Sequence, residues 1–127
     1  MLRVSRDAQG LIRKTWDTFD TGDEAGFLEC FAPDWVEHYG TMTATVEDAL
    51  GALRRYAEEL TDRETILEQV VVQGEWAAVR TTRRATHRGS GKPVLVHEIS
   101  VHRIENGRLA ESWTESSSPS VLEQIGA

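Results

Sequence analysis

The chain has 127 residues and a formal net charge of −7 at pH 7, with 39% hydrophobic and 28% charged residues. This length predicts one domain over residues 1–127, and the negative charge disfavours a phosphate backbone, so we expect no nucleic-acid partner. No apolar run approaches the roughly 18 residues of a membrane span, and the first ten residues lack the apolar segment of a signal peptide. We therefore expect no membrane partner. Because Cys30 is the only cysteine, no internal disulfide can form, and we expect a cytoplasmic protein.

Two helices are predicted at the start of the chain. The first is expected to begin near Ser5 and to align apolar side chains along one stripe as far as Phe19. The second begins at a capping-box pattern formed by Thr21 and Glu24 and ends at Pro33.

A short alternating strand over residues 34–39 precedes a third helix over residues 45–60, whose apolar residues recur at intervals of three and four. Strand patterns dominate the remainder of the chain: residues 65–73, 76–88, 93–105 and 108–117. Because helices precede strands instead of alternating with them, the pattern predicts an α+β fold with a core over about residues 8–116. The tail, residues 117–127, is expected to fray.

Two stretches carry a family resemblance. Residues 16–40, "WDTFDTGDEAGFLECFAPDWVEHYG", and residues 99–113, "ISVHRIENGRLAESW", resemble the SnoaL-like polyketide cyclases of the nuclear transport factor 2-like superfamily. The resemblance implies a cone in which three N-terminal helices pack on a curved antiparallel sheet and enclose an apolar pocket. It also implies a small hydrophobic ligand and a homodimer formed through the convex sheet face.

Strand alternation then assigns side chains to the pocket. Along residues 34–39, we place Val36 and His38 inside and the face of Glu37 outside. By similarity to the steroid isomerases of the same superfamily, His38 occupies the position of the general base, and the ordinary pKa of histidine, about 6.5, suits that role.

On the later strands, the same alternation places Glu98, Ser100 and His102 inside, together with Ser112 and Thr114. A carboxylate that faces a pocket needs a partner, and Arg80 or His102 is the expected one. A register one residue away would instead place His97, Ile99, Val101 and Arg103 inside and leave Glu98 on the surface.

The chain departs from its relatives at their catalytic positions. The oxyanion donors of the steroid isomerases correspond to Thr15 and Ser100, and the acid/base aspartate of the SnoaL-like cyclases corresponds to Thr114. A cavity tyrosine matches Tyr56. The predicted site therefore comprises His38 and Glu98 as catalytic residues and Trp16, Tyr56, Ser100, His102, Ser112 and Thr114 as ligand-binding residues.

Three functions remain open at this point. The first is an isomerase or cyclase without a cofactor, acting by acid/base chemistry on a hydrophobic carbonyl compound of polyketide or steroid type. The second is a binding module for a hydrophobic ligand, and the third is an epoxide or ester hydrolase in which Glu98 activates water. No metal is expected, because no two histidines are spaced to bind one together.

Overall fold

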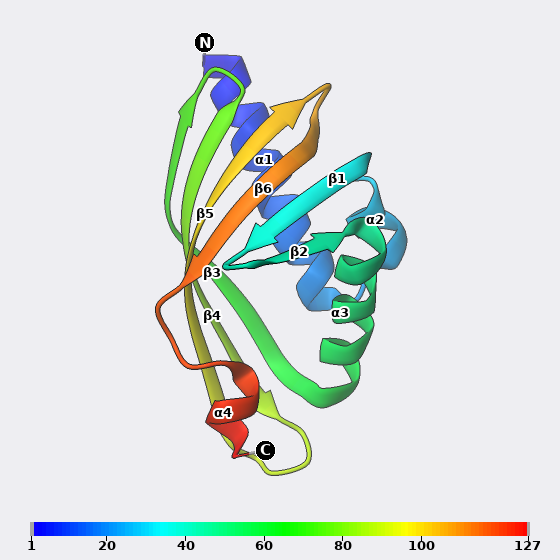
Figure 1. The fold of residues 1–127 in the computed structure, drawn as a ribbon, viewed down its shortest axis with the longest axis vertical. Coiled ribbons are helices and arrows are strands. Elements are labelled where there is room, and N and C mark those ends of the chain that lie inside the picture. The colour runs from blue at the N-terminus through cyan, green and yellow to red at the C-terminus, as the bar shows by residue number, and fades with distance from the viewer. Residues whose placement is uncertain (1, 127) are drawn as a thin grey trace.

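The computed structural model describes residues 2–126, which form four helices and six strands. In chain order these are α1 (Leu2–Thr21), α2 (Glu24–Leu28), β1 (Phe31–Tyr39), β2 (Met42–Thr45), α3 (Val46–Glu59), β3 (Leu60–Gln73), β4 (Trp76–His87), β5 (Pro93–Glu105), β6 (Arg108–Ser116) and α4 (Val121–Ile125). The predicted order of helices and strands is confirmed, with β2 and α4 as additions. Figure 1 shows α1 behind the strands and α3 beside β2.

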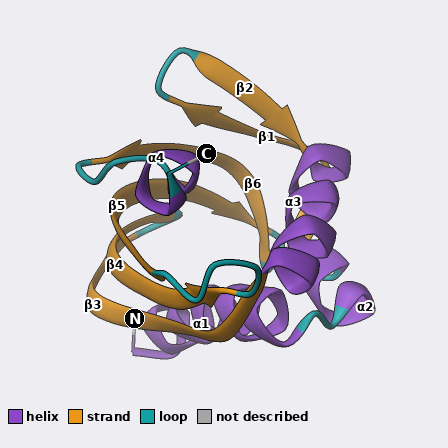
Figure 2. Cartoon of the chain, turned by 90° about the horizontal axis from the view of Figure 1, so that it is seen from below, coloured by secondary structure: helices purple, strands orange, loops and turns teal. Residues whose placement is uncertain are grey.

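The six strands form one sheet in the order β2-β1-β6-β5-β4-β3. Strand β1 runs parallel to β6, whereas every other neighbouring pair is antiparallel. The expected antiparallel sheet is therefore mixed, because β1 and β6 start at the same end, where Phe31 pairs with Leu109. Figure 2 shows the strong curvature of β3 to β6 and the position of α1 and α3 beside the curve.

Local sequence chemistry explains the element boundaries. The hydroxyl of Thr45 accepts from the backbone of Asp48, and the carboxylate of Asp48 accepts from the backbone of Thr45, which is a capping box at the start of α3. Asn106 and Gly107 both have positive φ, at 53° and 73°. This pair is the Asn-Gly sequence preferred in two-residue hairpins, and it joins β5 to β6.

The first two helices begin at other residues than the sequence predicts. Because α1 starts at Leu2, Ser5 lies within the helix and is not its N-cap. The N-cap of α2 is Asp23, whose side chain accepts from the backbone of Gly26, while Thr21 ends α1 and donates to Asp17. The second helix also ends early, at Leu28, and Pro33 lies within β1.

An apolar core joins the helices to the sheet. Its buried members are Ile12, Phe19, Phe27, Cys30, Phe31, Trp35, Leu53, Val79 and Leu109. Phe31 contacts both Phe27 and Trp35 edge to face, with ring centroids 4.8 and 4.6 Å apart. Such pairs anchor α2 and the start of β1 against the sheet.

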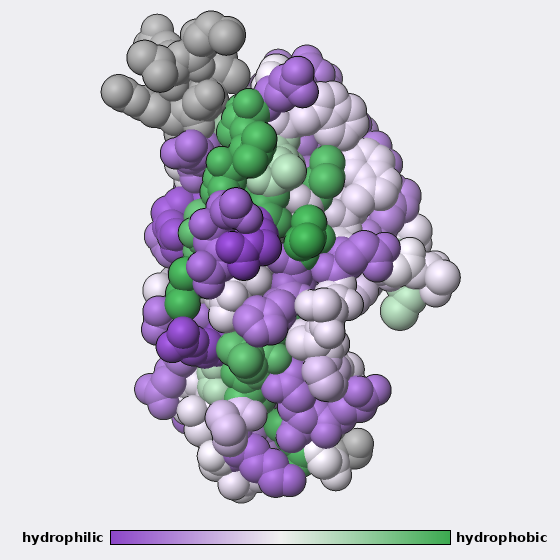
Figure 3. Space-filling model, turned by 90° about the vertical axis from the view of Figure 1, so that its left-hand side faces the viewer, coloured by the Kyte–Doolittle hydropathy of each residue, from purple (hydrophilic) through white to green (hydrophobic). Residues whose placement is uncertain are grey.

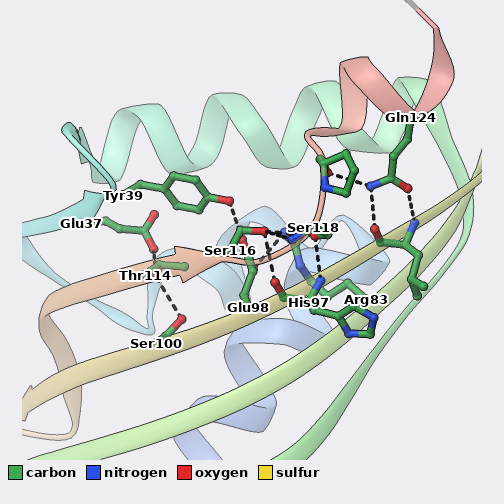
Figure 4. Close-up of polar contacts among 12 residues, drawn as sticks. Glu37, Tyr39, Arg83, His97, Glu98, Ser100, Thr114, Ser116, Ser118 and Gln124 are labelled. Carbon is green, nitrogen blue, oxygen red and sulfur yellow. Dashed lines mark hydrogen bonds and ion pairs between the residues drawn. The ribbon is translucent and has the colours of Figure 1, made fainter.

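The tail is ordered and packs on the sheet, contrary to the expectation that it frays. Val121 and Ile125 of α4 contact a second cluster, formed by Leu60, Val94 and Val96. The amide of Gln124 donates to the carbonyl oxygen of Leu95 and accepts from its N–H, at 2.6 and 2.7 Å. As Figure 4 shows, this side chain occupies the edge of β5 beyond the end of β6.

Truncation of Leu53, which is 1% exposed, should lower the free energy of unfolding by about 2–5 kcal/mol, because it leaves a cavity between α3 and the core. Urea unfolding of Leu53→Ala measures this loss. Leu28→Ala is the matched control, since Leu28 is 39% exposed, and it should cost less than about 1 kcal/mol. Equal losses in the two variants would contradict the described core.

Candidate functional site

A cavity of about 260 Å³ lies between the concave sheet face and the helices. One wall is mostly apolar and comes largely from α1 and α3 with nearby aromatic residues: Ile12, Trp16, Phe19, Phe27, Phe31, Ala49, Ala52 and Tyr56. The opposite wall is polar and comes from the strands: Glu37, Tyr39, Arg83, Glu98, Ser100, His102, Ser112 and Thr114. Ligand pockets commonly measure about 300–1,000 Å³, so this cavity suits a compact ligand.

The inner face of β1 is the one that carries Trp35, Glu37 and Tyr39. The prediction that His38 enters the cavity is wrong, because alternate residues of a strand point to opposite faces. His38 lies on the outer face, where Nε2 is 2.7 Å from Oε2 of Glu111 and the ring stacks on Trp113. Its neighbour Glu37 therefore takes the place in the cavity that the sequence assigns to His38.

The other predicted residues lie where strand alternation places them. Glu98, Ser100 and His102 face the cavity from β5, and Ser112 and Thr114 face it from β6. Trp16 and Tyr56 contribute to the helical side of the same cavity. The alternative register is excluded, because Ile99 is 57% exposed whereas Glu98 is 5% exposed.

Side-chain hydrogen bonds and one ion pair arrange these residues in three polar rows. The first two rows cross β1, β6 and β5, and the third crosses β1, β5 and β4. Neighbouring rows are about 7 Å apart, the spacing of alternate residues in a strand. In the first row, the indole Nε1–H of Trp35 donates to Oγ of Ser112 at 2.9 Å, and this Oγ lies 2.7 Å from Nδ1 of His102. Burial lowers the pKa of His102 to about 4, so its imidazole is neutral at physiological pH.

The second row contains the carboxyl group of Glu37. Oγ1 of Thr114 donates to Oε2 of Glu37 at 2.8 Å and lies 3.0 Å from Oγ of Ser100. Burial raises the pKa of Glu37, the hydrogen bond from Thr114 opposes the shift, and the nearby charge of Glu98 raises the pKa further. Figure 4 shows this row beside the Glu98 carboxylate. Glu37 is thus poised to exchange a proton closer to neutral pH than an ordinary glutamate.

The third row holds Glu98 between two partners. Tyr39 donates its hydroxyl hydrogen to Oε2 of Glu98 at 3.0 Å, and Nη2 of Arg83 lies 3.1 Å from Oε1. Burial, followed by the charge of Glu98 and the hydrogen bond to it, raises the pKa of Tyr39 to about 12. The guanidinium of Arg83 also lies over the ring of Trp16, 4.8 Å from its centroid.

Among the described residues, Glu98 pairs with neither of its expected partners, and His102 bonds to Ser112 instead. Arg80 lies on the outer face, where Nε donates to Gln69, and Arg83 forms the ion pair instead. Arg83 lies an even number of residues after Ala77 and Val79 on β4, so it shares the strand face of these two buried residues. That pattern could have identified it from the sequence.

Thr15, which corresponds to an oxyanion donor in the steroid isomerases, also lies beside the cavity. Its hydroxyl donates to the carbonyl oxygen of Leu11 one turn earlier, at 2.7 Å. The hydrogen of Thr15 is therefore directed into the helix and not toward a ligand.

Two kinds of feature are absent from residues 2–126. No helix there combines the length and the apolar character needed to cross a bilayer. Within the same described range, histidine, cysteine and acidic side chains nowhere gather in a group of three that could hold a metal ion.

The buried His102 should make stability depend on pH. Its folded-state pKa is depressed from 6.5 to about 4, so its contribution is present above pH 6.5 and is lost as the pH falls toward 4. Relative to His102→Asn, the wild type should lose roughly 3 kcal/mol more of its unfolding free energy between pH 7 and pH 4. Urea unfolding at both values measures the difference.

The matched control for that measurement is His97→Asn, because His97 is exposed on the opposite face of the same strand. This control should follow the wild type. If His102→Asn also followed the wild type, the imidazole of His102 would not be buried in its neutral form.

Comparisons with known proteins agree with this geometry. TsrD from Streptomyces laurentii is 26% identical over 96% of both chains, with a TM-score of 0.82. IdmH from Streptomyces antibioticus, a proposed polyketide cyclase, is 26% identical over 94% of this chain and 98% of its own, with a TM-score of 0.79. AclR from Streptomyces galilaeus, a proposed hydroxylase, shares the fold at 19% identity over 96% of this chain and 97% of its own, with a TM-score of 0.83.

Among curated protein sequences, none matches the chain. The family model of the SnoaL-like domain, in contrast, matches residues 12–112, which include both the helices and the polar wall of the cavity. The chain therefore belongs to the SnoaL-like domain family.

Proposed function

We propose that the protein is a cytoplasmic enzyme that needs no cofactor and isomerises or cyclises a compact, hydrophobic carbonyl compound by acid/base chemistry. The observation that carries this proposal is the position of Glu37, a carboxyl group with a raised pKa in a mostly apolar cavity. A carboxylate with a raised pKa accepts a proton from carbon more readily than an ordinary glutamate.

The proposed reaction begins with Glu37 ionised. Its carboxylate removes a proton from the carbon next to the carbonyl group, and the electrons of the broken C–H bond move onto the carbonyl oxygen to form an enolate. Glu37 then returns the proton to another carbon of the same molecule, which completes an isomerisation. Alternatively, the enolate carbon attacks a second carbonyl group and closes a ring, and the alkoxide formed on that group takes the proton back from Glu37. No oxidant or reductant is needed in either case.

Glu98 retains a supporting role in this proposal. Its carboxylate is 5% exposed and is held by Arg83 and Tyr39, so it is a fixed negative charge close to Glu37. This charge disfavours the ionised form of Glu37 and thereby strengthens it as a base. Two carboxyl groups in different surroundings of one cavity are a recurring arrangement for acid/base chemistry.

Glu37→Gln should abolish proton exchange without removing the ligand site. The probe is 2-tetralone, a bicyclic ketone with acidic hydrogens next to its carbonyl group, and the measurement is deuterium incorporation in D₂O by NMR. We expect the exchange catalysed by the wild type to fall about 10²–10⁴-fold in the variant. His38→Ala is the matched control, since His38 is the next residue on the same strand but lies on the outer face, and it should stay within about twofold of the wild type.

The pH profile of the same exchange follows from the direction of the pKa shift. The rate should rise with pH through a pKa above the ordinary glutamate value of 4.5 and then level off, because only ionised Glu37 accepts the proton. If Glu37→Gln bound 2-tetralone and retained full exchange, catalysis by Glu37 would be excluded. Binding of 2-tetralone without exchange by the wild type would favour a non-catalytic binding module.

We also propose that the protein is a homodimer formed through the convex sheet face. Apolar side chains gather on that face, as Figure 3 shows. This convex patch consists of Trp76, Leu95, Ile99, Val101 and Trp113, which are 36–57% exposed. Apolar side chains in such number on one sheet face are typical of a surface covered by a partner.

Ile99→Arg should therefore convert the dimer into a monomer, because Ile99 is 57% exposed on the convex patch. Light scattering after size-exclusion chromatography measures the mass. Met42→Arg is the control, since Met42 is exposed on β2, away from the patch, and should remain dimeric. A monomeric wild type at micromolar concentration would contradict the proposal.

A further inference from the structure

The first polar row contains a hydrogen-bond chain whose direction can be worked out from its members. The indole Nε1–H of Trp35 can only donate, so Oγ of Ser112 is an acceptor in that bond. Ser112 is fully buried, at 0% exposure, and its own hydroxyl hydrogen must also find an acceptor. Within the described chain, the only other polar group bonded to this hydroxyl is Nδ1 of His102, at 2.7 Å.

The alternative direction would leave a buried hydrogen without a partner. If Nδ1 of His102 carried the hydrogen, Oγ of Ser112 would accept from both the indole and the imidazole. Its own hydrogen would then be unpaired in a site without exposure. A buried unpaired polar group costs about 1–3 kcal/mol, which corresponds to a preference of roughly 5- to 150-fold for the arrangement in which Ser112 donates to Nδ1.

We infer that Trp35 and Ser112 are positioning residues that hold His102 as the tautomer with its hydrogen on Nε2, and that this N–H donates to the carbonyl or enolate oxygen of the bound compound. The inference rests on the proposed function, because it assigns a partner to the oxygen on which charge develops. His102 lines the cavity and is neutral at physiological pH, so its Nε2–H is a fixed donor that carries no competing charge.

The hydroxyl groups of the second and third rows have no hydrogen left to donate to a ligand oxygen. When Glu37 is ionised it can only accept, so Thr114 gives its hydrogen to Glu37, and Ser100 in turn must donate to Thr114. Tyr39 gives its hydrogen to Glu98. The hydroxyl hydrogens of Thr114 and Tyr39 are thus directed toward carboxylates, and that of Ser100 is directed toward Thr114. Nε2 of His102 is therefore the neutral donor that the three rows leave for a ligand oxygen, whereas the donors of Arg83 belong to the charged group that pairs with Glu98.

The tautomer can be observed directly and without a substrate. Long-range ¹H–¹⁵N NMR of the wild type near pH 7 should show a protonated, pyrrole-like Nε2 and a bare, pyridine-like Nδ1 on His102. A protonated Nδ1 would overturn the inference. Ser112→Ala should remove the preference for the Nε2 tautomer, and a merely structural role for Ser112 would leave the two nitrogen signals unchanged.

The donor function is tested with bound 2-tetralone. Hydrogen bonding from Nε2 should lower the carbonyl stretching frequency of the ligand in the wild type, and Ser112→Ala should reverse most of that shift. Tyr56→Phe tests whether the hydroxyl of Tyr56 donates this hydrogen bond instead, because Tyr56 also lines the cavity. The shift should persist in that variant, and its loss there would assign the hydrogen bond to Tyr56 and overturn the role of His102.

The effect of Ser112→Ala on kcat and KM distinguishes a positioning role for Ser112 from a role in ligand binding. Ser112→Ala should reduce kcat for deuterium exchange by roughly 10- to 100-fold with little change in KM, somewhat less than the complete loss of an oxyanion donor. A rise in KM at unchanged kcat would contradict the inference. If the wild type exchanged no deuterium at all, the proposed function would fail, while the tautomer and the carbonyl shift would still decide this inference on their own.

Discussion

The hydrogen bond from the indole of Trp35 to the hydroxyl of Ser112 determines which face of β1 lines the cavity. Both groups are buried, and Trp35 also packs edge to face on Phe31 in the core. Once Trp35 is inside, strand alternation places Glu37 inside as well and His38 outside. The acid/base chemistry of the cavity therefore follows from one tryptophan that has both an apolar ring to bury and one hydrogen to donate.

The polar wall illustrates how a buried sheet face can hold charged groups. Each of its carboxylates accepts from neighbouring hydroxyl or guanidinium groups, namely Glu37 from Thr114 and Glu98 from Tyr39 and Arg83. The hydrogen bonds offset part of the cost of burial, but burial still dominates at Glu37, whose pKa is raised. The same low-polarity surroundings keep His102 neutral. One cavity thus holds a base and a neutral donor, and the two roles differ because the hydrogen-bond partners differ.

Much of the fold and part of the site could be predicted from the sequence. The alternation of β5 is regular from Val94 to His102, so Glu98, Ser100 and His102 were placed correctly. Strand β1 is short, and its pairing with β6 is irregular between Phe31 and Val36, so its alternation could not be extended from a longer pattern. The resemblance to steroid isomerases also favoured His38, although a tryptophan such as Trp35 is highly buried on average, which favours the other face.

Other features depend on contacts between distant segments. The parallel pairing of β1 with β6 joins residues more than seventy positions apart, and no local pattern specifies it. The docking of α4 requires the edge of β5 that β6 leaves open, where Gln124 contacts Leu95. Arg83 is different, because its alternation with buried Val79 was present in the sequence and predicts the inward position that the structure shows.

The most direct test of the account is the protonation of Glu37 itself. Carboxyl ¹³C NMR can follow the side chain through a pH titration, with the signal assigned by its absence from Glu37→Gln. The account predicts a midpoint above the ordinary glutamate value of 4.5, because burial and the charge of Glu98 both favour the protonated form. A midpoint at or below that value would show that Glu37 is solvated or strongly stabilised as the anion, and would contradict its role as the base of the cavity.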